Sequence, residues 1–196
     1  MALLFGVLWP LQRVNDWLLA IGRALAVIAL ALMVVFILGQ VFFRYVLNDA
    51  PNWTEEGARF LMLWMTGFMA PLAFRKGGFV AIDMLERALP RMLSALLTFV
   101  LLSIAMLVLV YCVQLGWENV NSLTGRGRSA SLRLPLDWFG GERIRFRNNW
   151  AYASLFTGFV LLVLVNMELL LRQLIVLLGG GDRLTPLSDG NVARAD

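Results

Sequence analysis

The sequence contains no histidine and only one cysteine, and these two shortages exclude several classes of function. Without histidine, the chain lacks the usual protein ligand of haem, His-containing zinc sites and His-based catalytic triads. The single cysteine, Cys112, lies in an apolar run and has no second cysteine with which to form an intramolecular disulfide. Disulfide-dependent extracellular folds are therefore excluded, and we expect no metal site and no cofactor.

Charged residues are also scarce. They make up 15% of the 196 residues, against 60% hydrophobic residues, and the mean hydropathy is +0.74. A soluble domain has about 25% charged residues, so the apolar surplus here must face lipid. The net charge of +4 comes from arginines between hydrophobic segments, which suits topology signals and lipid headgroups better than nucleic acid. We expect one all-α integral membrane domain over 1–196.

Four segments are long enough to cross a bilayer. A hydrocarbon core of about 30 Å requires about 20 helical residues. The expected spans are about 20–44, 55–74, 92–117 and 150–178, with an outer loop at about 118–149 and a helix stop at residues 179–181. Only 15 uncharged residues separate Arg59 from Arg75, so the second span must include charged residues in its first turns.

Two short amphipathic segments are expected, one before the first span and one at 79–89. For the second, a short helix in the membrane interface and a plain connecting loop are nearly equal alternatives. The first has an apolar face (Leu11, Val14, Leu18, Ile21) opposite a polar one (Gln12, Arg13, Asp16). With four spans, both termini lie on one side of the membrane. Placing that side in the cytoplasm gives nine Lys and Arg residues inside and seven outside, which is a weak bias.

A charged cluster is expected where the first two spans form a hairpin. The short connection predicts that Arg44 lies level with the start of the second span, where Glu55 precedes Arg59 by one helical turn. One interpretation is a transport site for protons or cations. The other is a charge-balanced helix start that contacts a neighbouring protein, and the equal number of acids and arginines favours it. The cluster comprises Arg44, Trp53, Glu55, Glu56, Arg59 and Trp64.

Other polar residues within the spans predict helix contacts. Gln40 and Asn166 are expected to hydrogen-bond to another helix. Glu168 and Arg172 are expected to form a solvated or headgroup-level pair, and Gly67 is expected to serve helix packing.

These motifs resemble the small membrane subunit of tripartite ATP-independent periplasmic (TRAP) transporters. The resemblance covers roughly residues 10–175, and its most specific part is the hairpin. One departure is Phe79, where the family often has histidine. The motifs are Gln40-x-x-x-Arg44-Tyr45, Trp53-Thr54-Glu55-Glu56-x-x-Arg59 with Trp64, the stretch Arg75–Asp83, and Leu134-Pro135-x-x-Trp138.

The resemblance implies a non-enzymatic scaffold subunit in the bacterial inner membrane, with both termini cytoplasmic. Its partners would be a large multispanning subunit, which carries the organic acid and the coupling ion, a periplasmic substrate-binding protein, and membrane lipids. The hairpin residues would stabilise the junction with the large subunit.

The implied topology makes 118–149 a periplasmic loop with a net charge of +3. Arg126 and Arg128 are candidates for docking an acidic face of the binding protein, while contact of the loop arginines with anionic headgroups is an equal alternative. For the chain as a whole, the alternative function is a self-sufficient, proton-coupled transporter that acts as a homo-oligomer.

Overall fold

Four long helices form the protein in a computed structural model, which describes residues 2–48, 52–76, 90–122, 128–134, 144–147 and 149–180. The helices are α1 (Ala2–Val46), α2 (Asn52–Arg75), α4 (Arg91–Asn121) and α6 (Asn149–Leu177). Each is long and apolar enough to cross a membrane. The prediction of an integral membrane protein with four spanning helices is therefore confirmed.

Helices are the physically required form for these segments, because in hydrocarbon each backbone N–H and C=O must find its partner within the chain. The end of α6 shows how the sequence terminates a helix. Gly179 adopts a positive φ of 79°, its N–H bonds to Val176 O at 3.0 Å, and the Gly180 N–H bonds to Ile175 O at 2.9 Å. These two bonds form a Schellman motif, which confirms the predicted helix stop.

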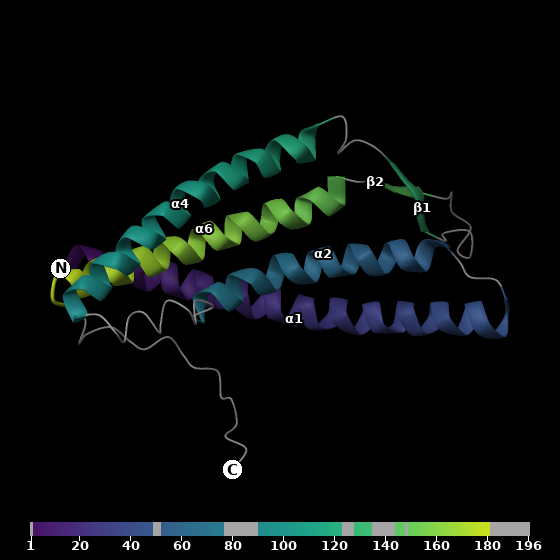
Figure 1. The fold of residues 1–196 in the computed structure, drawn as a ribbon, viewed down its shortest axis with the longest axis horizontal. Helices are drawn as coiled ribbons and strands as arrows, with labels where there is room; N and C mark the ends of the chain where they lie inside the picture. Colours follow the sequence, from purple (N-terminus) through teal and green to yellow (C-terminus); the bar gives the residue numbers. More distant parts are fainter. Residues whose placement is uncertain are drawn as a thin grey trace, which may run out of the picture.

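The helices lie side by side with α6 in the centre (Figure 1). In this view α6 lies between α4 and α2, and α1 flanks α2. The first residues of α1 and the last residues of α6 meet at the same end of the bundle. The described ends of the chain therefore share one side, as an even number of spans requires.

Two glycines allow α2 and α6 to cross with their backbones in contact. A Cβ added to Gly67 would lie 2.7 Å from the carbonyl oxygen of Ser154, and one added to Gly158 would lie 3.0 Å from the Cα of Gly67. Close approach through small residues is a common means of association between membrane helices. The predicted packing role of Gly67 is thus confirmed, with Gly158 as its counterpart.

Helix α1 extends well beyond its partner. Asp16 contacts Arg75, and Phe36 packs against Trp53, so the antiparallel register aligns residues 16–36 of α1 with almost all of α2. At 1.5 Å per residue, the 45 residues of α1 reach about 67 Å. Its last residues, from about 38 to 46, therefore project past the first turn of α2.

The predicted amphipathic segment before the first span is the start of α1 itself. Its face toward the bundle consists of Asn15, Leu19, Gly22 and Ala26, while Val14 is exposed. The predicted apolar face is thus not the packing face. Membrane helices select small and polar residues for contact, since their large apolar residues lose nothing by facing lipid. The second predicted segment, 79–89, lies outside the described residues.

A small antiparallel β-hairpin, which no pattern in the sequence predicted, lies within the predicted outer loop. Strand β1 (Arg128–Leu134) pairs with β2 (Ile144–Arg147) in a register that sets Arg128 opposite Arg147 and Arg133 opposite Arg145. Strand β1 contacts α2, and strand β2 contacts α6.

Candidate functional site: two charged clusters and a lipid-facing cavity

An ion pair between Arg59 and Glu55 lies in the predicted cluster at the start of α2. The Nη2 of Arg59 donates to Glu55 Oε1 one turn away, and these side chains are 75% and 58% exposed, respectively. Trp53 packs edge-on against Phe36 of α1 with ring centroids 5.6 Å apart. Trp64 lies one turn from Phe68, at a centroid distance of 5.4 Å. The contact of Phe36 with Trp53 thus joins α1 to α2, the contact of Trp64 with Phe68 lies within α2, and the ion pair remains exposed.

Arg44 does not join this pair. It lies in the projecting end of α1, and the register places Glu55 beside residues near 34. The axial separation of Arg44 from that level is about 15 Å. Glu56 is half-buried near the start of α2. Of the two candidate docking arginines, Arg128 begins β1 and Arg126 lies outside the described residues.

A second cluster, which we call the buried cluster, joins three helices at the opposite end of α2. Its centre is Glu168 of α6, whose side chain is 0% exposed. Glu168 Oε2 accepts a hydrogen bond from Asn15 Nδ2 of α1 at 2.7 Å, and Oε1 accepts one from Arg75 Nη2 of α2 at 2.8 Å. The cluster comprises Asn15, Asp16, Arg75, Glu168 and Arg172.

The two arginines complete the charge balance of the buried cluster. Arg75 also donates from Nη1 to Asp16 at 2.5 Å, and Arg172 Nε donates to Glu168 Oε1 at 3.3 Å. Both arginine side chains are only 12% exposed. Two carboxylates thus face two guanidinium groups, which makes the cluster formally neutral. Glu168 thus accepts hydrogen bonds from one residue each of α1, α2 and α6 and ties the three helices together.

Glu168 and Arg172 form the predicted pair, but a solvated pair is wrong for the acid, which is buried, whereas the headgroup-level alternative stays a prediction. The one-turn spacing was correct, but α1 extends to residue 2 and covers this end of α6, which buries Glu168. Asn15 and Arg75 lie 153 and 93 residues away from Glu168 in the sequence. No local pattern links residues at such separations.

Amide side chains connect α6 to α4. Asn166 Nδ2 donates to Leu102 O at 3.1 Å, and Gln173 Nε2 donates to Ala95 O at 3.0 Å. The predicted interhelical bond of Asn166 is confirmed, and Gln173 was missed. Gln40 makes no such bond within the part of the chain that the structure describes. The Oδ1 of Asn166 is buried and has no hydrogen-bond partner among the described residues.

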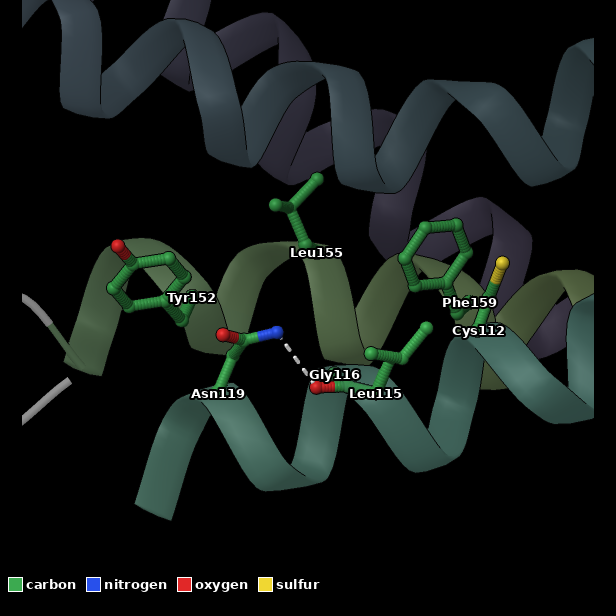
Figure 2. Close-up of a pocket in the computed structure, with 7 residues that line it drawn as sticks. All are labelled: Cys112, Leu115, Gly116, Asn119, Tyr152, Leu155 and Phe159. Atoms are coloured by element: carbon green, nitrogen blue, oxygen red, sulfur yellow. Dashed lines mark hydrogen bonds between the residues drawn. The ribbon is translucent and has the colours of Figure 1, made fainter. Parts of the chain in front are cut away.

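A cavity of about 280 Å³ lies between α4 and α6 (Figure 2). Figure 2 shows Cys112 and Phe159 at one end of the cavity and Asn119 and Tyr152 at the other. Among the described residues, no three His, Cys, Asp or Glu side chains are placed to hold a metal ion. The lining residues are Cys112, Leu115, Gly116, Asn119, Tyr152, Leu155 and Phe159.

Comparison with known proteins agrees with this architecture. Residues 33–141 match the model of the family described as tripartite ATP-independent periplasmic transporters, DctQ component. A Haemophilus influenzae protein with the provisional name TRAP transporter small permease protein is 33% identical over 95 residues. That alignment covers 47% of this chain and 57% of the relative, so it spans about half of each. The family match covers more than half of the four-helix chain, which therefore belongs to the DctQ family of small TRAP transporter components.

Proposed function

We propose that this chain is the scaffold subunit of an ion-gradient-driven TRAP transporter for organic acid uptake, and that it binds and stabilises the large transport subunit. It would lie in the bacterial inner membrane with both termini in the cytoplasm, and it would catalyse no reaction. Family membership and the four spanning helices support the coarse assignment. The scaffold role is supported by the way in which the buried charged side chains pair with one another.

The observation that carries the proposal is that the charged side chains deepest in the bundle are occupied by one another. Glu168 accepts from three donors, and Arg75 bridges it to Asp16. A carboxylate that carries protons or cations needs an alternative state in which its present donors are released. Glu168 instead stabilises the contact of three helices, as expected of a rigid support.

The outer faces of α1 and α4 suit a protein that is surrounded by lipid and by a larger membrane partner. Exposed large apolar residues follow both helices, among them Val35 and Leu38 on α1, and Leu107 and Tyr111 on α4. The projecting end of α1 is apolar as well, with Phe42 and Val46 exposed. These exposed apolar residues do not take part in packing within the bundle, so they can face lipid or a membrane partner.

The rival function, a self-sufficient proton-coupled transporter, is favoured by one observation: Glu168 is an ionisable residue within a membrane-spanning helix. The two functions predict different effects of the Glu168→Gln substitution on assembly and on transport. In a scaffold, Glu168→Gln should weaken assembly first and reduce uptake only as a consequence. In a proton-coupled transporter, the same variant should assemble normally and lose transport.

The test is co-purification from native membranes. The full chain would be tagged at its C-terminus and extracted in mild detergent, and the proteins that elute with it would be identified by mass spectrometry. A stoichiometric, much larger multispanning protein is the expected result. Recovery of the chain alone, or only as a homo-oligomer, would contradict the scaffold role. Glu118→Gln, which changes an exposed carboxylate near the end of α4, is the matched control for Glu168→Gln.

Docking of a periplasmic binding protein through Arg126 and Arg128 is part of the proposal. Their reversal to glutamate should weaken docking in a salt-sensitive way, because electrostatic attraction between exposed surfaces is screened by ions. Surface plasmon resonance at two ionic strengths would measure the effect. Unchanged binding by the doubly reversed chain would remove these two residues from the docking surface.

A further inference from the structure

Helix α2 contains a proline in its interior, and this proline leaves one backbone oxygen without its usual donor. Pro71 lies one turn before Arg75, the last residue of α2, and it is fully buried. In an α-helix the N–H of each residue bonds to the carbonyl oxygen four residues earlier, and proline has no N–H. The carbonyl oxygen of Gly67 therefore lacks the intrahelical bond that any other residue at position 71 would supply.

The Gly67 oxygen needs another partner, because α2 is a membrane-spanning helix. An unsatisfied carbonyl is costly in hydrocarbon, and a proline is tolerated there when a neighbouring helix, a side chain or a water replaces the missing bond. Gly67 is buried and faces α6. The hydroxyl of Ser154, a neighbouring donor on α6, is already used, since it donates to Ala151 O at 2.7 Å. The replacement must therefore come from another group at this crossing.

The backbone of α6 offers such a group. A Cβ added to Gly158 would lie 3.0 Å from the oxygen of Gly67, so the Cα hydrogen that occupies this direction lies beside that oxygen. In return, a Cβ added to Gly67 would lie 2.7 Å from the oxygen of Ser154, which places a Cα hydrogen of Gly67 beside it. Contacts between Cα–H groups and carbonyl oxygens recur where helices pack closely. Each helix thus presents a Cα–H group to a carbonyl of the other.

We propose that Gly67, Ser154 and Gly158 form a backbone latch, in which the Cα–H of Gly158 replaces the donor that Pro71 removes from α2. The reciprocal contact from Gly67 to Ser154 O closes the latch. Only glycine can serve at both crossing positions, because a side chain on either would displace the backbone that it faces. The latch is independent of the scaffold role, since it requires no large subunit.

The latch has a consequence for the buried cluster. Sharp bends in helices occur mostly at proline, so Pro71 is the position at which α2 would bend. The latch holds α2 against α6 before Pro71, and the bond from Arg75 to Glu168 holds it after Pro71. The last turn of α2 therefore cannot swing about the proline while the latch is closed. The latch thereby positions Arg75 for its place in the buried cluster.

The missing donor is tested by the carbonyl ¹³C chemical shift of Gly67 in the full chain, in mixed micelles. Labelling with [1-¹³C]glycine and [¹⁵N]phenylalanine selects the three Gly–Phe peptide bonds of the sequence, and Phe68→Leu identifies that of Gly67. In Pro71→Ala, the new N–H should bond to Gly67 O and move the carbonyl signal downfield. Pro10→Ala, which replaces the proline inside α1, is the matched control and should leave the signal unchanged.

The role of Gly158 is tested by unfolding in the same micelles, followed by circular dichroism. Gly158→Ala would place a methyl group 3.0 Å from the Cα and the oxygen of Gly67 and should lower the unfolding midpoint. Gly116→Ala is the matched control and should lower it less, because its nearest neighbour lies at an ordinary contact distance of 3.4 Å. The loss from Gly158→Ala should be smaller in the Pro71→Ala background, where Gly67 O has a donor in its own helix.

Two results would overturn the proposal. A Gly67 signal that does not move in Pro71→Ala would show that this oxygen already has an N–H or water donor. An equal loss from Gly158→Ala with and without Pro71 would show that Gly158 contributes close packing alone. The first measurement adds no bulk to the crossing, so it decides the question even if Gly158→Ala does not fold. Co-purification of the large subunit is read independently, so a failure of the latch leaves the scaffold role standing.

Discussion

Two ion pairs in this protein have the same spacing and opposite surroundings. Glu55–Arg59 in α2 and Glu168–Arg172 in α6 each place the acid one turn before the arginine. The first pair lies at the exposed start of α2. The second is enclosed by α1 and α2, and its acid accepts additional bonds from Asn15 and Arg75. Equal spacing therefore does not predict an equal contribution to stability. The cost of removing the acid depends on its burial and on its additional partners.

The largest expected difference follows from deleting each acid. Glu168→Ala leaves two mostly buried arginines without their shared carboxylate and should destabilise the bundle by about 3–5 kcal/mol. Glu55→Ala should cost less than about 1 kcal/mol, because both its partner and the acid itself are solvated. Unfolding of each variant in mixed micelles, followed by circular dichroism, measures both values. Equal losses would remove the distinction between the clusters.

Substitution of the arginines should rank the two clusters in the same order, with a smaller difference in the loss of stability. Arg75→Gln loses charge-assisted bonds to both Asp16 and Glu168 and should cost about 2–3 kcal/mol. Arg59→Gln, which loses one exposed bond, is the matched control. Both variants are compared by their unfolding midpoints in the same micelles. A larger loss for Arg59→Gln would show that the hairpin cluster is the more important one.

Asn15 should be energetically coupled to Glu168. Asn15→Ala should cost about 1–2 kcal/mol, and the double variant with Glu168→Ala should fall short of the sum by at least about 0.5 kcal/mol. Asn166→Ala is the control, because Asn166 bonds to Leu102 of α4 instead. Its effect should add to that of Glu168→Ala. Strict additivity for Asn15 would contradict the network in α1, α2 and α6.

The smallest effect expected is the response of the two pairs to salt. The stabilisation that Glu55 gives to α2, about 0.3–0.5 kcal/mol, should fall when ionic strength rises from 0.01 to 1 M. The contribution of Glu168 should change little, because ions cannot screen a pair that the helices enclose. Unfolding of Glu55→Gln and Glu168→Gln at both salt concentrations gives the comparison.

Sequence patterns predicted the helices well because crossing a bilayer imposes a simple rule on length and charge. The spans, the glycine stop after Leu178, the Gly67 contact and the bond of Asn166 all followed from local features. The buried cluster did not, because it depends on how far α1 extends and on which residues of three helices meet. A clue was available in Asn15, a polar residue one turn from apolar Leu11 and Leu19 on the helix surface.

The expectation that Arg44 lies level with Glu55 failed for a related reason. A short connection fixes which helices are neighbours but not how far one slides past the other. The contacts of Phe36 with Trp53 and of Asp16 with Arg75 set that slide. Strands β1 and β2 were missed because their arginines suggested a solvated loop, whereas pairing between strands is a non-local property.

The slide of α1 past α2 also affects the surrounding membrane. The uncharged run of α1 covers residues 24–43, whereas that of α2 covers residues 60–74, and the observed register offsets their midpoints by about ten residues. This offset is about 15 Å, or half the thickness of the hydrocarbon layer. A flat bilayer would match only one of the two uncharged runs, so we expect lipid beside α1 to be displaced along the membrane normal relative to lipid beside α2. Such a displacement would form a step in bilayer depth, and a neighbour of matching height would be drawn to it by the relief of hydrophobic mismatch.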